Sequence, residues 1–589
     1  MKQFNIVLVL MMTMLVGFSS CEKMMYVESD RYVYADNNRL DSPNDSVFSL
    51  VGILYQFQKL GDQYVLLGEL RGDLMDVTQN ATNDLIALNQ LDYSDTENEY
   101  LNMSNYYAVI NNCNYLIQNM DTSIVVQGEQ TLLREVAAAK AIRAWTYLQM
   151  ALNYNGAFYY EMPILTVAQS QEVSSNKDLY FKDREQLFDL LIADLYPMLG
   201  VSYPTYPVTS SNIDELIPSM YYILGEIYLW KGMYKQAAEM YYQDIYKSHA
   251  VVTSDYSSSL QEMSGFVSVN GYSKEDPYNN YFLGGYYIYD VWAGQYSNEA
   301  TARIEYYIND VYGRFNPSKI YRYTYSDYCV KPSEHAIQFF AQQPYLHQGE
   351  TENGGRVNIA TNGDLRGITG CMRYVEENMS SLSTEGMSAT QMKQFEQVAI
   401  YQEPNSSVYI SLYSEHSYAT SSDIYLQSSN LAYLRYAEAI NRAGKPSVAL
   451  AVINNGLNMA TLRDSLKVSP WELDSALVEK WGDQAFLKNV GTRTRGQGVS
   501  TKVNFFFETS NPSLNDSILF VEKVLLEECA LETAFKGNRF HDLLRYTNHP
   551  DAPNYIAEAL AKKYPERAGE FASKNVEDWF IPYPHQQAE

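Results

Sequence analysis

The sequence predicts an all-α dominated protein, in which a scaffold of helical repeats is interrupted by a long irregular insertion carrying short helices and strands. Three observations predict this fold class: helix-period apolar residues before about residue 245, two copies of one helical-hairpin pattern about 200 residues apart, and a loss of helical periodicity between them. The chain has 589 residues, of which 46% are hydrophobic, so it can bury a large core and intrinsic disorder is excluded.

The net charge argues against one class of partner. The chain has 43 Lys and Arg residues against 70 Asp and Glu residues, which gives a formal net charge of −27. Nucleic acids and anionic lipid headgroups bind proteins mainly through Lys and Arg. We therefore expect no nucleic acid partner.

The first 20 residues have the pattern of a targeting segment. A short basic start, Met1 to Gln3, precedes an apolar run from Phe4 to Phe18, which is shorter than the roughly 20 residues that span a membrane. Small residues then lead to Cys21. The segment resembles the lipobox of bacterial lipoproteins, with residues 1–20 as signal peptide and Cys21 as the lipidated first residue of the mature chain. A plain secretory signal peptide with an incidental cysteine is the alternative.

Residues 21–250 form the predicted N-terminal helical part. Between Glu129 and Leu152 the apolar residues follow one stripe at helical spacing. Near the end of this part comes the helix–turn–helix spacing of a tetratricopeptide repeat. Its residues are Tyr221, Leu224, Gly225, Tyr228, Gly232, Ala237 and Tyr241. Small residues at the contact predict two closely packed antiparallel helices with Gly232 in the turn.

Residues 422–589 form the predicted C-terminal helical part, which completes the repeat scaffold. It contains a second copy of the repeat at the same offsets: Tyr433, Tyr436, Ala437, Ile440, Gly444, Ala449 and Ile453. Two copies so far apart predict a tetratricopeptide-like helical repeat scaffold interrupted by another segment.

The cysteines favour neither a disulfide framework nor a metal site. Only four follow Cys21, and none forms a CxxC pair. Cys113 and Cys529 lie in apolar helical patterns, where cysteine usually packs as a small buried hydrophobe. No contiguous calcium-binding loop is visible either. We expect no metal and no cofactor.

The interrupting segment, residues 251–421, is rich in tyrosine. Fourteen of the 53 Tyr residues lie in residues 271–330, where an even distribution would place about five, and Trp292 lies among them. Two interpretations stay open. The rings are loop anchors packed on the helical base, or they form a platform on which sugar rings stack, with neighbouring Asn, Asp and Gln side chains bonding the hydroxyls.

The C-terminal part contains a stretch that resembles the signature of the SusD/RagB family, often written ER-x-x-E-L-x-x-E-G-x-R-x-x-D-L-x-R. The stretch runs from Glu527 to Arg545, and the matching residues are Glu532, Phe535, Gly537, Arg539, Asp542, Leu543 and Arg545. Lys536 stands where the family commonly has Glu, and Cys529-Ala530 replaces more typical residues.

Six further sequence motifs of the family occur in the correct order, so the resemblance covers nearly the full chain. They are Tyr107, Ile110 and Asn114 of one helix, Ala139 to Leu148, Met162 to Ile164, Gly363 to Arg366, Leu434 to Ala439, and Phe580 to Pro582. One departure is Met103, where the family usually has Trp.

The resemblance implies a glycan-binding lipoprotein on the cell surface, anchored in the outer membrane through its N-terminal lipid. Such a protein captures oligosaccharide or polysaccharide and delivers it to a TonB-dependent transporter of the SusC type, over which it closes as a lid. Capture of another nutrient, such as peptides, for the same kind of transporter is the alternative that the resemblance leaves open.

Two segments supply the candidate ligand-binding residues. The glycine-flanked part of the Tyr-rich stretch supplies Tyr281, Tyr286, Tyr287, Trp292 and Tyr296 as stacking residues. The resemblance adds the loop after the first long helices, where Arg71, Asp73 and Asn80, together with Asp76, are polar candidates. Arg71 and Asp73 fit a local helix-end ion pair equally well.

The sequence favours binding over catalysis. It contains no HExxH, GxSxG, Walker or GxGxxG motif, and its His residues have no metal-ligand spacing. The charged residues of the C-terminal signature, Glu532, Arg539, Asp542 and Arg545, predict a partly buried charge network that pins the last helix to the core. They do not predict a catalytic acid, because guanidinium partners lower the pKa of a carboxyl group. The Gly- and Arg-rich stretch from Gly491 to Gly498 fits a turn fixed to the core better than an anion site.

Overall fold

The computed structural model describes residues 43–250, 329–350 and 424–583, with short gaps at 80, 126–127, 129, 209–210, 249, 498–501 and 508–511. It also describes residue 252 and the stretches 302–304, 356–362, 364, 366, 372–376 and 396–400. Helices dominate these residues, as the sequence predicts. The predicted signal peptide, Cys21 and most of the irregular segment 251–421 lie outside the described residues.

The N-terminal helices surround one long central helix. They are α2 (Pro43–Phe57), α3 (Gly61–Glu69), α4 (Asn83–Asn89), α5 (Ser104–Asn119), α6 (Thr131–Tyr154), α7 (Val167–Ser175), α8 (Lys177–Tyr180) and α9 (Arg184–Leu195). The predicted helix between 129 and 152 is α6, which packs against α2, α5 and α9. It is buried on almost all sides rather than along one stripe, because its many alanines let neighbours approach from several directions.

Both predicted helical hairpins are confirmed. The first consists of α10 (Met220–Trp230) and α11 (Tyr234–Lys247), joined at Gly232 with φ +68°. A Cβ atom on Gly225 would lie 2.7 Å from the Tyr241 ring, so the two helices approach closely only because this residue is glycine. The second consists of α16 (Ser429–Arg442) and α17 (Pro446–Asn454), joined at Gly444 with φ +90°.

The two hairpins stack directly on each other. Helix α11 packs against α16, although more than 180 residues separate them in the chain. The remaining C-terminal helices are α18 (Met459–Arg463), α19 (Ser475–Trp481), α20 (Thr494–Gln497), α21 (Leu514–Thr533), α22 (Arg539–Thr547), α23 (Tyr555–Lys563) and α24 (Ala568–Ser573). Helix α21 covers α16 and α17, so the array continues without a break from α10 to α21.

Short antiparallel strand pairs connect segments of the chain. The pairs are β1 (Met75–Val77) with β7 (Val330–Pro332), β2 (Gly156–Phe158) with β3 (Phe181–Asp183), β4 (Pro207–Val208) with β5 (Ser211–Asn212), β6 (Ala302–Ile304) with β12 (Ile424–Gln427), β8 (Pro344–Glu350) with β9 (Arg356–Asn362), and β10 (Met372–Glu376) with β11 (Glu396–Ile400). Helix α14 (Glu334–Ala341) follows β7.

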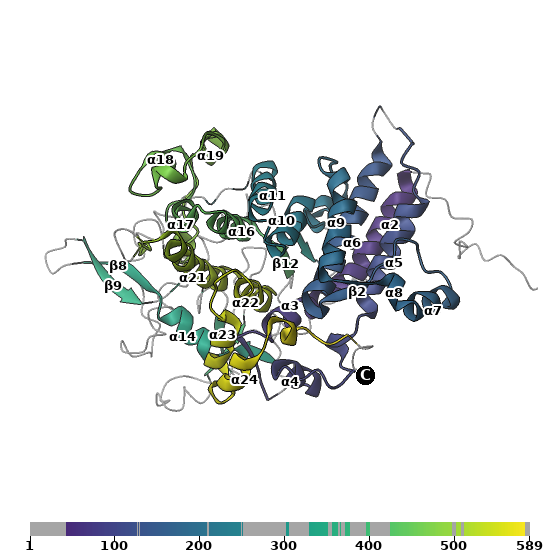
Figure 1. The fold of residues 1–589 in the computed structure, drawn as a ribbon, viewed down its shortest axis with the longest axis horizontal. Coiled ribbons are helices and arrows are strands. Elements are labelled where there is room, and N and C mark those ends of the chain that lie inside the picture. Colours follow the sequence, from purple (N-terminus) through teal and green to yellow (C-terminus); the bar gives the residue numbers. More distant parts are fainter. Residues whose placement is uncertain are drawn as a thin grey trace, which may run out of the picture.

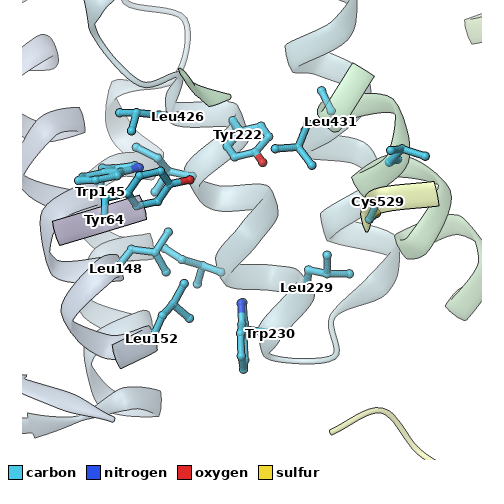
Figure 2. Close-up of a cluster of buried hydrophobic side chains, with 14 of the residues drawn as sticks. Tyr64, Trp145, Leu148, Leu152, Tyr222, Leu229, Trp230, Leu426, Leu431 and Cys529 are labelled. Atoms are coloured by element: carbon cyan, nitrogen blue, oxygen red, sulfur yellow. The ribbon is translucent and has the colours of Figure 1, made fainter. Parts of the chain in front are cut away.

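One hydrophobic core joins the two helical parts. Figure 2 shows Tyr64 and Trp145, whose ring centroids are 5.5 Å apart, on the N-terminal side of this core. Tyr222 of α10 lies in the middle, and Leu431 and Cys529 lie on the C-terminal side. None of the described helices has the length and apolar character needed to cross a membrane.

The C-terminal segment returns to the N-terminal helices. The Ile581 backbone N–H donates to the Asn153 carbonyl oxygen at 2.9 Å, and the hydroxyls of Tyr583 and Tyr107 share a hydrogen bond of 2.7 Å. These contacts close the scaffold, because they tie the last described residues to α5 and α6.

Candidate ligand-binding site

A short strand pair joins the 71–80 loop to residues that follow the Tyr-rich stretch in the sequence. Strand β1 lies in the loop of residues 71–80, and it pairs with β7, which begins two residues after the Tyr-rich stretch ends at Tyr328. Asp76 faces Lys331 in this pairing, and the Thr78 backbone N–H donates to the Cys329 carbonyl at 3.0 Å. The 71–80 loop therefore lies beside the described residues 329–332.

Arg71 holds the core together and is not placed to contact a ligand. Its side chain is fully buried, and its guanidinium donates to Asn153 Oδ1 at 2.9 Å and to the Trp579 carbonyl at 2.7 Å. The same group stacks on the Phe540 ring at 3.8 Å. Arg71 thus joins α6, α22 and the C-terminal segment.

Asp73 is also fully buried, so the expectation that it contacts a sugar conflicts with its position. Its two carboxylate oxygens accept from the Arg539 guanidinium at 2.7 and 2.9 Å, and His335 Nε2 lies 3.3 Å away. The alternative of a local ion pair with Arg71 does not form either. The loop turns these two side chains inward because each has a buried partner hundreds of residues away.

The polar surface of this loop lies three to six residues after Asp73. Asp76 is half-buried and accepts from Asn89 Nδ2 at 2.9 Å, and Gln79 is exposed. Lys563 supports the turn from below by donating to the carbonyl oxygens of Leu70 and Gly72, both at 3.1 Å. Asn80 lies outside the described residues.

The described parts of the irregular segment are pinned to the scaffold at several points. At its start, the Val252 N–H donates to Asn489 Oδ1 at 3.0 Å, and the Val252 carbonyl accepts from the Val490 N–H at 2.7 Å. Further along, β6 pairs with β12, which leads directly into α16. The predicted stacking residues Tyr281, Tyr286, Tyr287, Trp292 and Tyr296 lie outside the described residues.

A buried charge cluster forms another anchor of the irregular segment. Arg366 is 1% exposed, pairs with Asp364 through two hydrogen bonds of 2.9 and 2.8 Å, and donates to Glu528 at 2.8 Å and to Glu532 at 3.1 Å. Arg493 also reaches Glu528, at 3.3 Å. Burial alone would raise the pKa of the Asp364 carboxyl, but the Arg366 guanidinium holds it below its usual value.

The Gly- and Arg-rich stretch from 491 to 498 contributes to the same anchor, which confirms the turn interpretation. A Cβ atom on Gly496 would lie 2.2 Å from Asp364 Oδ1, and one on Gly491 would lie 2.1 Å from the Ile453 carbonyl oxygen. The Arg493 side chain is buried and paired inside the protein.

The predicted charge network of the C-terminal signature is confirmed in part, because Asp542 and Arg545 share one buried network, whereas Glu532 pairs with Arg366 and Arg539 pairs with Asp73. Arg545 donates to both carboxylate oxygens of Glu438 at 2.7 Å and to Asp542 at 3.0 Å, and Arg435 joins Asp542 at 2.6 Å and Glu226 at 2.8 Å. The network ties α10, α16 and α22 together. Sequence reasoning missed Glu226 and Glu438 as partners, although Glu438 lies in one of the family motifs.

This network does not provide a general acid. Burial would raise the pKa of the Glu438 carboxyl, but the Arg545 guanidinium holds it well below its usual range. A general acid for glycoside hydrolysis needs a raised pKa.

Two of the cysteines lie in the core, as the sequence predicts. Cys113 and Cys529 are free and buried, as predicted, and burial raises the pKa of the Cys113 thiol to about 12. In the part of the chain that the structure describes, no three His, Cys, Asp or Glu residues are grouped to hold an ion.

The fold was compared with known proteins. No family model and no curated protein sequence matches the chain. Among solved structures, a SusD superfamily protein from Bacteroides vulgatus is 14% identical with a TM-score of 0.56, and the match covers 93% of this chain and 96% of that chain. The protein has the SusD-superfamily fold. A SusD homologue from Bacteroides thetaiotaomicron (13% identity, TM-score 0.50, coverage 93% and 95%) and a SusD-like carbohydrate-binding protein from Bacteroides fragilis (12% identity, TM-score 0.50, coverage 86% and 86%) are similar to it as well.

The SusD-like sequence motifs lie at buried polar contacts of this fold. Asn114 accepts from Arg143 at 2.6 Å and so joins two of the motifs, while Arg366 of a third motif donates to Glu532 of the C-terminal signature at 3.1 Å. These motifs therefore supply the contacts that hold the SusD-like scaffold together, and they do not indicate which ligand is bound.

The buried ion pairs predict that the protein loses stability at acid pH. Burial would raise the pKa of the Asp73 carboxyl, but Arg539 beside it holds that pKa well below its usual range, as Arg545 does for Glu438. In the unfolded chain these groups titrate near pH 4, so their stabilisation is present above about pH 5 and is lost as the pH falls below about 4.

Burial raises the pKa of Glu69 to about 7, although four backbone N–H groups donate to it, and its contribution is lost as the pH rises through that value. We expect the urea midpoint to be highest near about pH 5 and to fall on both sides. A midpoint that stays constant from about pH 5 down to about pH 3 would contradict this assignment.

Proposed function

We propose that the protein is a cell-surface glycan-binding lipoprotein that captures oligosaccharide or polysaccharide and passes it to a TonB-dependent transporter of the SusC type, acting as its lid. The observation that carries the proposal is the near full-length SusD-superfamily fold, which it shares with a protein described as SusD-like and carbohydrate-binding. The protein acts by binding and releases no product.

The arrangement of the scaffold supports a division of labour. Loops on a rigid scaffold carry specificity, and helical repeats present extended surfaces for protein partners. The Tyr-rich segment is anchored through Val252, β6, β7 and Arg366, and the 71–80 loop lies beside one of these anchors. Aromatic rings suit sugar stacking, and Asp76, Gln79 and Lys331 supply polar groups at the anchor formed by β1 and β7.

The proposed attachment rests on the lipobox-like segment. Lipidation of Cys21 would attach the acyl chains ahead of α2, which begins at Pro43, and a protein held by acyl chains needs no membrane-spanning helix. The transporter partner follows from the family resemblance.

The first test is native affinity electrophoresis of the soluble chain from Glu22 to Glu589. We expect one polysaccharide from a panel of plant, host and microbial glycans to retard the wild-type protein, and Trp292→Ala to lose most of this retardation because a stacking ring is removed. Mobility in gels without polysaccharide serves as the control for folding and charge.

Other outcomes redirect the proposal. Retardation that survives Trp292→Ala keeps glycan capture and moves the contact toward the 71–80 loop, where Gln79→Ala becomes the next variant. The absence of retardation by every glycan would refute glycan capture, and binding to peptides would then support the alternative nutrient.

A further inference from the structure

Trp471 differs from every other tryptophan in the described residues. Its side chain is 64% exposed, whereas Trp145, Trp230, Trp481 and Trp579 are at most 4% exposed. No hydrogen bond or ring contact within the described part of the chain involves its indole. Leaving a large aromatic ring in water forgoes the free energy that burying it would contribute to folding.

The turn that carries Trp471 is fixed on both sides. Before it, Val468 is fully buried and the Ser469 N–H donates to Ser447 Oγ at 2.8 Å. After it, the buried Glu472 carboxylate accepts from the Ser447 N–H at 2.9 Å and the Val448 N–H at 3.0 Å, and so caps the first turn of α17. The Trp471 backbone is thereby held rigidly while its ring stays in solvent.

Polar groups surround this ring in sequence. Asp464 and Lys467 form an exposed ion pair at 3.2 Å, and Asp474 pairs with Lys445. A protein interface needs a broad apolar core inside a polar rim, whereas one rigid ring among donors and acceptors matches a single sugar ring with its hydroxyls. The charged residues that flank Trp471 along the chain therefore favour a sugar over a protein partner.

Trp471 also lies far from β12, the strand through which the irregular segment returns to the scaffold. That segment returns to the scaffold through β12, directly before α16, whereas Glu472 holds the start of α17 at the opposite end of α16. With 14 residues at 1.5 Å each, α16 separates the two places by about 20 Å. One ligand reaches both only if it is a chain of several sugars.

We propose that Trp471 is a second glycan-contact site, a rigid aromatic platform on which one sugar ring of a long polysaccharide stacks. The proposal rests on the proposed function and adds to it a preference for polymers. A second contact on the same chain raises overall affinity because its binding becomes intramolecular.

The test compares Trp471→Ala with Leu466→Ala in affinity gels that contain the polysaccharide retarding the wild-type protein. Leu466 is 93% exposed in the same excursion and is the matched apolar control. We expect Trp471→Ala to weaken apparent affinity about fivefold, Trp471→Tyr to retain most of it, and Leu466→Ala to change nothing. Calorimetry with short oligosaccharides of the same glycan should give equal affinity for Trp471→Ala and wild type.

Three results would overturn the platform. Wild-type retardation that Trp471→Ala leaves unchanged refutes it and leaves the proposed function standing, and so does an equal loss with Leu466→Ala, which would indicate a general apolar patch. No retardation of the wild-type protein by any glycan would refute both proposals together.

Discussion

Arg366→Met is expected to destabilise the folded protein by about 3–5 kcal/mol, since it leaves buried carboxylates without a counter-ion. Arg366 is 1% exposed and pairs with Asp364, Glu528 and Glu532, of which Glu528 is also reached by Arg493. Methionine has a similar length but offers no donor, so the change removes charge and hydrogen bonds while keeping much of the volume. The free energy of unfolding from urea titration measures the effect.

Arg567→Met is the matched control for this substitution. Arg567 is 27% exposed and pairs with Glu570 three residues away on the surface, so its replacement should cost at most about 1 kcal/mol. If Arg366→Met cost no more than this control, the buried cluster would not be an anchor. Glycan affinity measured on the folded fraction would then show whether the anchor also positions the ligand-binding segment.

Gly68→Ala is expected to destabilise the protein by about 3 kcal/mol or more, because α3 meets the turn before α22 backbone against backbone. A Cβ atom on Gly68 would lie 1.9 Å from the Gly537 carbonyl oxygen, and backbone atoms cannot move aside as a flexible side chain can. This close approach also delivers the Glu69 carboxylate to the N–H groups of Gly537 and Asn538 at 2.8 and 2.9 Å. One methyl group would therefore disturb both packing and capping.

Gly569→Ala provides the opposite expectation. Gly569 lies in α24, and nothing would lie within 4 Å of an added Cβ atom. Alanine there should stabilise the protein by up to about 1 kcal/mol, because glycine loses more backbone entropy in a helix. Equal thermal midpoints for the two alanine variants would refute the role assigned to the contact between Gly68 and Gly537.

The repeat hairpins could be predicted from sequence because their determinants are local. Gly225 and Ala237 fall at fixed offsets that depend only on helical periodicity, and Gly232 and Gly444 have the positive φ angles that their turns need. The interior of α6 was harder to predict, because burial on all sides depends on how many neighbours pack around it.

The candidate site could be predicted only in part. The Tyr-rich stretch and the 71–80 loop stood out by composition and resemblance, and the pairing of β1 with β7 joins this loop to the residues that follow the stretch in the sequence. The individual polar residues did not follow. Arg71 and Asp73 look like solvent-facing groups in sequence, but Trp579 and Arg539, more than 460 residues away, hold them in the core.

The sequence by itself determined the repeat hairpins, the charged C-terminal signature and the candidate lipid anchor, because each is written in residues that lie close together along the chain. Only the tertiary structure decided that α11 stacks on α16, that Arg366 joins the irregular segment to α21, and that Trp471 alone among the described tryptophans remains exposed. These features depend on which distant surfaces meet and exclude water, and local periodicity contains no information about that choice.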